Sequence, residues 1–245
     1  AGSGPAVVSF NPAHLAGQTK YALSATYSSR WSLEGFSEYS AAASLPTRYL
    51  NFGLAWHQRS VADIYGEGTA ALLFARKITD ELWAGGAAKL FITSAPGAET
   101  WGDPAYLGTQ YSFCADLGLL YSPAPKWRFG IATRSMGEPE IALLESSAEG
   151  GSPGGQLALG GSWLVAEEFT LALDLVSDEG NLRKWTPRAG MEIVFFDALS
   201  LRAGSRGDRI ALGAGLQDER WAFDAALSNH RWLGNIYRVT LTLSY

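Results

Sequence analysis

Hydrophobic and polar residues alternate with a period of two along almost the whole chain. The pattern is clearest at the C-terminus, where large apolar side chains occupy every second position from Tyr237 to Tyr245, with Arg, Thr and Ser between them. Strict alternation is typical of β-strands, and no segment keeps a helical period over a comparable length. The pattern predicts about fourteen strands, at residues 20–29, 36–45, 48–58, 67–78, 82–94, 110–121, 126–136, 154–165, 168–176, 185–196, 198–205, 209–217, 219–228 and 234–245.

The two faces of these strands distinguish between two kinds of all-β protein. A soluble sheet turns a Lys- and Glu-rich face to water and packs its apolar face inside. Here one face carries large apolar residues, with Trp and Tyr at the strand ends, and the other carries Gly, Ala, Ser and Thr with scattered charges. A transmembrane barrel has this pattern, with an apolar outer band, aromatic girdles and a polar interior. The sequence therefore favours a closed antiparallel transmembrane β-barrel over a soluble all-β fold.

The connections between the predicted strands support the same fold. One alternate set is short throughout, at residues 45–47, 79–81, 122–125, 166–167, 197–198 and 217–219. The other set holds every long segment, at residues 59–67, 95–109 and 137–155. Outer-membrane barrels have short periplasmic turns and longer external loops. This asymmetry predicts a bacterial outer-membrane location, with lipid around the wall and both termini in the periplasm.

Composition narrows the class of protein further. Of the 245 residues, 47% are hydrophobic and only 18% are charged, which excludes a disordered chain. The longest dense apolar run, residues 70–75, is far shorter than the ~18 residues that suggest a membrane-spanning helix. Cys114 has no partner for a disulfide, and a net charge of −5 argues against nucleic acid as a partner.

Two short stretches resemble outer-membrane families. The C-terminus is similar to the signal that the barrel-assembly machinery recognises, although such signals usually end in Phe; the positions are Tyr237, Val239, Leu241, Leu243 and Tyr245. Residues 9–17, Ser-Phe-Asn-Pro-Ala-His-Leu-Ala-Gly, resemble the Asn-Pro-Ala-Gly-Leu motif of FadL-like fatty-acid transporters and of the PorV/PorQ barrels of type IX protein secretion. In those families the motif precedes the first strand, and Gly usually stands where this chain has His14. The resemblance implies fourteen strands and the barrel-assembly machinery as a partner.

The motif near the N-terminus has two interpretations. Asn and Pro are ordinary turn residues, so the motif can simply deliver the chain to the first strand. Alternatively, residues 1–19 form a hatch that plugs the lumen of a barrel made by residues 20–245. We favour the hatch, because a fourteen-stranded barrel is too wide for its wall side chains to fill. Its expected contacts are hydrogen bonds from Asn11 and apolar burial of Phe10 and Leu15; the predicted hatch residues are Phe10, Asn11, Pro12, Ala13 and Leu15. Because the chain begins at Ala1, we also expect that a signal peptide and part of the hatch were removed.

Charged residues fall on the small-residue face of many predicted strands. Alternate residues of a strand share one face, and this rule assigns a set of charged residues to the lumen. They are Glu38, Lys77, Lys89, Asp116, Arg128, Arg134, Asp174, Arg188, Glu192, Arg202, Arg209, Asp224 and Arg238. Neighbouring strands alternate in sign, as in Asp174 with Arg188 and Glu192 with Arg202, so the favoured interpretation is a set of ion pairs that brace the wall. The alternative is a polar path for a solute. Basic residues outnumber acidic ones in this set, so an open path should disfavour cations.

No pattern of residues indicates catalysis, a metal or a cofactor. His57 with Asp63, or His230 with Asp224, are conceivable acid–base pairs, but no motif supports either of them, and His14 belongs to the hatch. No His, Cys and carboxylate spacing indicates a metal site. The triplet at residues 206–208, Arg-Gly-Asp, lies between two predicted strands, where Gly-Asp favours a hairpin turn. We therefore do not interpret it as an adhesion motif. The sequence therefore predicts a protein without enzymatic activity or cofactor.

Two functions from different classes remain. Compact predicted loops and a short hatch favour an accessory barrel of PorV/PorQ type, which binds subunits or cargo of a protein-secretion complex. The alternative is a FadL-like passive transporter, in which a hydrophobic small molecule enters from outside and leaves through the wall or the lumen.

Overall fold

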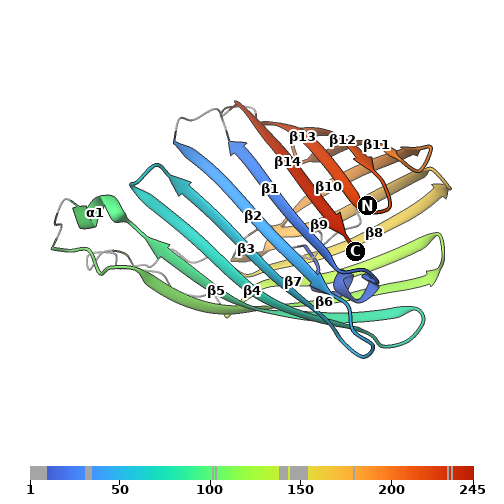
Figure 1. Cartoon of the computed structure of the whole chain (residues 1–245), viewed down its shortest axis with the longest axis horizontal. Coiled ribbons are helices and arrows are strands. Elements are labelled where there is room, and N and C mark those ends of the chain that lie inside the picture. Colours follow the sequence, from blue (N-terminus) through green and yellow to red (C-terminus); the bar gives the residue numbers. More distant parts are fainter. Residues whose placement is uncertain are drawn as a thin grey trace.

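Fourteen strands close into one antiparallel barrel in the computed structural model, which describes residues 10–30, 35–100, 102, 104–137, 143, 154–178, 180–230, 232 and 234–245. Each strand pairs with its neighbours in the sequence, and β1 pairs with β14 to complete the ring (Figure 1). The strands are β1 (Ala22–Arg30), β2 (Phe36–Leu45), β3 (Asn51–Val61), β4 (Tyr65–Lys77), β5 (Leu82–Ser94), β6 (Gln110–Ala124), β7 (Trp127–Met136), β8 (Gln156–Ala166), β9 (Phe169–Asp178), β10 (Asn181–Phe195), β11 (Leu199–Arg206), β12 (Arg209–Gln217), β13 (Trp221–His230) and β14 (Gly234–Ser244). The closed antiparallel barrel and the strand count predicted from the alternation are confirmed.

Two short helices accompany the barrel in the described residues. The 3-10 helix η2 (Pro12–Gly17) lies near one end, where the connections are short, and α1 (Pro96–Thr100) lies at the opposite end (Figure 1). We call these the short-turn end and the α1 end. Neither helix is long and apolar enough to cross a membrane.

The predicted long connection at residues 59–67 is wrong. Strands β3 and β4 run on to Val61 and Tyr65, so only residues 62–64 join them. Arg59 and Glu67 suggested a polar loop, yet they are direct register partners whose side chains meet. The predicted connection at 95–109 is present and contains α1. Most of the one predicted at 137–155 lies outside the described residues, as do residues 1–9 of the hatch.

Register fixes which side chains face outward. Leu241 pairs with Ala25 on one side and Phe223 on the other, and Leu241 and Phe223 keep 47% and 43% of their surface exposed. The next residue, Thr242, pairs with Ser24 and is only 6% exposed. Successive strand residues point to opposite faces, so large apolar side chains cover the outer wall and small residues line the lumen. The predicted assignment of the two faces is confirmed.

Aromatic residues gather on the outer wall near the short-turn end. Trp127 and Trp163 are register partners whose rings stack at 5.2 Å between centroids, and Phe129 stacks on Trp127 at 6.2 Å. Offset stacking of this kind adds to the apolar contact between neighbouring strands. The stack therefore ties β7 to β8 at the position where the barrel prediction expects an aromatic girdle.

Candidate functional site

The N-terminal segment packs against the inner wall of one half of the barrel. Helix η2 contacts β3, β4, β5 and β6. Leu15 is fully buried against Leu73, Ala75 and Ala87 of that wall. Because these partners are small or branched apolar residues, the segment sits close to the strands rather than across open space.

Asn11 caps η2 with one end of its side-chain amide and binds the wall with the other. Its Oδ1 accepts a hydrogen bond from the Ala13 amide at 2.9 Å, which caps the helix. Its Nδ2 donates to the carbonyl oxygens of Leu119 at 3.1 Å and Ile131 at 3.3 Å. Asp can supply the cap but not the two donated bonds, so the position requires an amide.

Glycines on the inner wall make room for this contact. Gly85 and Gly118 are register partners on β5 and β6, and Gly130 lies on β7. A Cβ atom at Gly118 would overlap the Asn11 Oδ1, and one at Gly85 would stand 2.6 Å from the Pro12 carbonyl carbon. A Cβ at Gly130 would stand 3.4 Å from the Asn11 Nδ2. Gly85 and Gly118, which we call the docking glycines, let the segment lie directly on the backbone of the wall, whereas a Cβ at Gly130 would only touch it.

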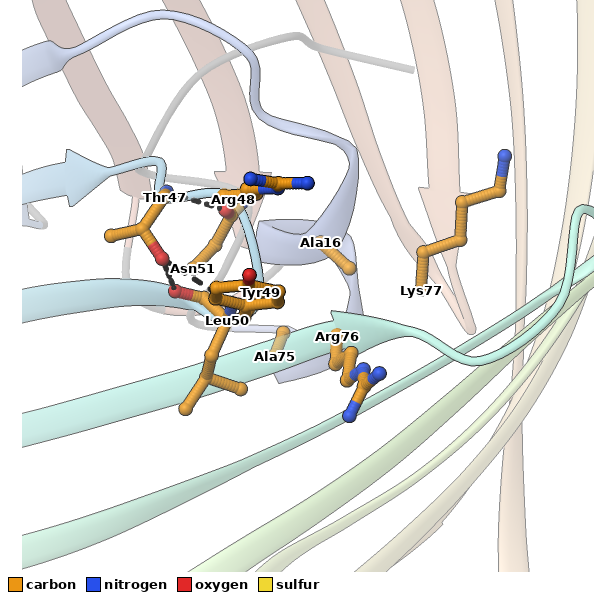
Figure 2. Close-up of a pocket in the computed structure, with 9 residues that line it drawn as sticks. All are labelled: Ala16, Thr47, Arg48, Tyr49, Leu50, Asn51, Ala75, Arg76 and Lys77. Carbon is orange, nitrogen blue, oxygen red and sulfur yellow. Dashed lines mark hydrogen bonds between the residues drawn. The ribbon is translucent and has the colours of Figure 1, made fainter.

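Asn51 holds the other end of η2. Its Nδ2 donates to the carbonyl oxygens of Leu15 and Gln18, both at 2.8 Å. Its Oδ1 accepts from the Thr47 amide at 3.0 Å, so the β2–β3 turn orients it (Figure 2). A cavity of about 200 Å³ opens here between η2, that turn and the end of β4, lined by Ala16, Thr47, Arg48, Tyr49, Leu50, Asn51, Ala75, Arg76 and Lys77 (Figure 2). Our sequence reasoning missed Asn51, which is the first residue of a strand and belongs to no motif.

The predicted hatch residues divide into two groups. Asn11, Pro12, Ala13 and Leu15 are buried against the wall, as expected. Phe10 is not, because 54% of its surface is exposed and its ring lies 5.1 Å below the Arg134 guanidinium. The expectation that Phe10 buries apolar surface is therefore wrong; the ring makes a cation–π contact instead.

His14 is a partly buried residue of η2. Burial and the positive charge of Arg128 lower the pKa of its imidazole to about 4. His14 is therefore neutral at pH 7.

One set of inward charges forms a network at the α1 end of β1–β4. Arg30 binds Glu38, and His57 Nε2 lies 3.3 Å from the Glu38 carboxylate. Next to them, Arg59 Nη1 contacts Glu67 at 2.9 Å, and the Tyr65 hydroxyl donates to the same carboxylate at 2.8 Å. Only Glu38 was predicted for the lumen. Arg30, Arg59 and Glu67 were missed because they fell at a predicted strand end or in the predicted loop.

A second cluster lies beside an irregularity in the wall. Lys89 pairs with Asp116, and the Ser135 amide donates to Asp116 Oδ1 at 2.9 Å. Ser135 has a φ of +51°, and the β6–β7 register shifts between Ala115 and Leu117. Cys114, the register partner of Lys89, is a buried lumen residue with a free thiol. The ion pair and the donated amide together hold β7 in register where the ladder is interrupted.

The remaining predicted charges behave in different ways. Arg202 binds both Glu192 and Asp224, so the predicted Glu192–Arg202 pair is confirmed. Asp174 and Arg188 are register partners, but they make no ion pair in the described part of the chain, which corrects the prediction for this pair. Lys77 binds Asp80 in a turn. Register also places Arg128, Arg134, Arg209 and Arg238 on the lumen face, opposite Ser162, Gln156, Arg206 and Ser28 respectively.

A larger cavity, of about 340 Å³, lies on the inner wall of β9–β13. Its lining is mostly Gly and Ala, and the Arg202 cluster forms its polar edge. The lining residues are Thr170, Ala172, Gly190, Met191, Glu192, Arg202, Ala203, Gly204, Ala211, Leu212, Gly213, Asp224, Ala225 and Ala226. Small side chains on five neighbouring strands leave this space open.

The conceivable acid–base pairs do not form. His57 faces Glu38 rather than Asp63, and Asp224 is held by Arg202. His230 Nδ1 instead accepts a hydrogen bond from the Trp232 amide at 3.3 Å. Within the described ranges, no three His, Cys or carboxylate side chains gather as a metal site would require.

The strand count and the closed antiparallel ring define the class by its fold: a fourteen-stranded antiparallel β-barrel. The chain is similar to the CymD monoaromatic hydrocarbon channel, with a TM-score of 0.70 and 12% identity over 99% of this chain and 93% of that one. It is also similar to the Pseudomonas putida toluene transporter TodX, with a TM-score of 0.66 and 14% identity over 99% and 93% of the two chains. A FadL homologue of Pseudomonas aeruginosa gives a TM-score of 0.67 and 14% identity over 98% and 94%.

Similarity to the KdgM porin is lower, with a TM-score of 0.51 and 7% identity over 91% of this chain and 99% of that one. No family model matches the sequence, and no curated protein sequence matches it. At these identities the neighbours establish the fold alone.

Proposed function

We propose that the protein lies in a bacterial outer membrane and passes small hydrophobic molecules through its lumen without catalysis. The observation that carries this proposal is the cavity on β9–β13, which is lined mainly by Gly and Ala. Ligand sites are usually concave and mostly apolar, with a few polar groups that orient the ligand. Here the Arg202 cluster supplies the polar groups at one edge.

The size of the cavity agrees with such a cargo. An apolar cavity of ~150 Å³ binds benzene. A space of about 340 Å³ therefore accommodates a molecule of one or two rings without movement of the wall.

The structural neighbours support this function over an accessory role. CymD is a monoaromatic hydrocarbon channel and TodX is a toluene transporter. Nothing in these similarities supports a PorV/PorQ-type subunit that binds secretion partners, which was our first choice from the sequence. We therefore place the FadL-like transporter first.

The outer wall supports the location. Its exposed large apolar side chains match acyl chains, and a closed barrel satisfies its backbone hydrogen bonds in lipid. In this proposal the short-turn end and both termini face the periplasm. The barrel-assembly machinery recognises the alternating C-terminal residues 237–245.

The hatch in this proposal is a plug on the side of the lumen opposite the cavity. Asn11 and Asn51 anchor it to β3, β6 and β7, so it covers one half of the wall and leaves β9–β13 accessible. A cargo can then occupy the cavity while the segment stays docked.

Uptake of a neutral hydrophobic dye tests the proposal. Cells with an intact outer membrane take up 1-N-phenylnaphthylamine slowly, and expression of the barrel should accelerate its uptake. Gly190→Trp places a large ring in the cavity and should return uptake to the rate without the barrel. Ala189→Trp adds the same ring to the outer face of the same strand and serves as the control. Equal uptake by both variants, at equal barrel levels, would contradict the proposal.

A further inference from the structure

We propose that a row of three arginines at the α1 end of the lumen binds the diphosphate or triphosphate group of a small water-soluble molecule. The row, which we call the arginine row, consists of Arg188 on β10, Arg206 on β11 and Arg209 on β12. The inference goes beyond the proposed function, because it adds a highly charged class of ligand to a barrel that we assign to hydrophobic molecules. None of the three arginines lines the β9–β13 cavity, so the two sites are separate.

Register places the three arginines side by side. Arg206 is the direct partner of Arg188 on one neighbouring strand and of Arg209 on the other. Neighbouring strands lie about 4.8 Å apart, so the three side chains leave the backbone within about 10 Å of one another. Arg206 follows the buried Ser200 by six residues on the same strand, so the arginine row belongs to the lumen face.

The connection between β11 and β12 holds the row in place. Only Gly207 and Asp208 join the two strands, and Gly207 has a φ of +60°, which favours glycine. The Gly207 amide donates a hydrogen bond to the Pro187 carbonyl oxygen at 3.2 Å, which ties this turn to β10 beside Arg188. The row is therefore built on paired strands and a short hairpin rather than on a long loop.

The arginine row has no carboxylate partner among the described residues, where none of its members forms an ion pair. Asp174 is the other register partner of Arg188, but its Oδ1 lies over Gly160 of β8, where a Cβ atom would overlap it. Asp208 is exposed at the tip of the hairpin. The positive charge of Arg206 consequently acts on Arg188 more strongly than the negative charge of Asp174 does.

Arg202 shows how the same wall neutralises an arginine elsewhere. Glu192 and Asp224 both bind it. Arg188, by contrast, keeps a buried Nε that has no hydrogen-bond partner in the part of the chain that the structure describes. Like charges directly opposite each other destabilise a pair of strands, and an unmade hydrogen bond of a buried donor costs free energy. An anion that binds the arginine row relieves both costs.

The charge of the row favours linked phosphate groups over a single carboxylate. A guanidinium presents paired N–H donors that match the oxygen atoms of a phosphate group. One carboxylate offsets one of the three positive charges, whereas a diphosphate carries at least two negative charges on adjacent groups and can contact neighbouring strands together. Arg206 is exposed, and Arg188 and Arg209 are only partly buried, so a hydrated ligand reaches the row from water.

Calorimetric titration of the purified full-length barrel, in micelles of an uncharged detergent and without divalent cations, tests the site with inorganic pyrophosphate. We expect pyrophosphate to bind at least tenfold more tightly than benzoate, which has a single charge. Arg206→Gln removes the central charge from an exposed position and should weaken pyrophosphate binding about tenfold, as expected for a charge-assisted hydrogen bond. Arg220→Gln makes the same change in an exposed turn at the short-turn end and should leave the affinity unchanged.

Adenosine diphosphate carries the same group on an organic molecule and distinguishes two sources of the ligand. Tighter binding of adenosine diphosphate than of pyrophosphate would assign the site to an organic diphosphate, and equal or weaker binding would assign it to the inorganic ion.

Two results would overturn the site. One is benzoate binding as tight as pyrophosphate binding to the native barrel. The other is equal pyrophosphate affinity of Arg206→Gln and Arg220→Gln when both keep the native shift in electrophoretic mobility on heating. The dye assay separates this inference from the proposed function, because dye uptake without pyrophosphate binding would remove the site and keep the conduit. Pyrophosphate binding without dye uptake would keep the site and remove the conduit.

Discussion

The two halves of the barrel use small residues for opposite purposes. On β3–β7, the space beside two glycines is occupied by another part of the chain, because Gly85 and Gly118 receive the backbone and side chains of residues 11–13. On β9–β13, Gly and Ala line an open cavity, and a Cβ atom at Gly190 would find only the Ala203 carbonyl oxygen, at 3.8 Å. Small inward-facing residues therefore form a docking surface on β3–β7 and an open cavity on β9–β13. Residue composition does not distinguish these two surfaces, whereas the contacts made by residues 11–13 do.

Removal of the hatch tests the comparison most strongly. Deletion of residues 1–19 should raise the ion conductance of the barrel in planar bilayers well above that of the intact protein, because the β3–β6 half loses its cover. The opened path should favour anions, since basic side chains outnumber acidic ones on the lumen face. Unchanged conductance would show that the hatch closes nothing.

The comparison between the two halves assumes that every strand turns its large apolar residues outward and its small residues toward the lumen. Leu241→Arg, on the outer face of β14, should destabilise the barrel in lipid by about 2–4 kcal/mol, as for other cations at the middle of the bilayer. Thr242→Arg, on the lumen face, should cost less. Urea unfolding in phospholipid vesicles measures both, and equal losses would reverse the assignment.

A single methyl group should distinguish the two halves. Gly118→Ala places a Cβ atom on the Asn11 Oδ1, so the segment must shift, at a cost of about 1–3 kcal/mol. Gly190→Ala meets open space and should change stability by less than ~0.5 kcal/mol. Limited proteolysis within residues 10–19 reports the displacement. Similar cleavage in both variants would mean that the docking glycines are ordinary wall residues.

The amide of Asn11 offers a finer test. Asn11→Asp keeps the cap on Ala13 but loses the bonds donated to Leu119 and Ile131, at a cost of about 1–3 kcal/mol to docking. Asn235→Asp adds the same charge near the α1 end of β14 and serves as the control. Faster proteolysis of the segment should appear only in the first variant.

The smallest expected effect is a pH dependence of docking. The His14 pKa is about 4 in the docked segment, against 6.5 for a free imidazole. The undocked segment therefore binds the extra proton first, and docking should weaken as the pH falls from about 6.5 to about 4. His14→Gln should remove this dependence. Conductance recorded from about pH 6.5 to about pH 4 measures this dependence. The same response in the native barrel and in His14→Gln would contradict the assignment of the pH dependence to His14.

The wall of the barrel was predictable from the sequence, whereas the contacts inside it were not. Alternation is a local property, so every strand and its outer face could be read from neighbouring residues. The Asn51 clamp and the docking glycines depend on which distant residues face one another across the lumen, and parity holds no such information. The Asp174–Arg188 pair shows the same limit, because register was right but the carboxylate turns toward Gly160. Residues 59–61 and 65–67 were misjudged because charges in a strand that faces a polar lumen resemble those of a loop.

The bonds of Asn11 also set an order of events during assembly. Its two carbonyl partners lie 108 and 120 residues further along the chain. Asn11 precedes every strand of the barrel in the chain, yet it has no binding partners on the wall until β6 and β7 are side by side. Contacts of such long sequence separation form late, because many residues must be ordered before they can be made. We expect the segment to close over the lumen only after the half of the wall that contains β6 and β7 exists, so that the assembling barrel passes through a stage in which it is open.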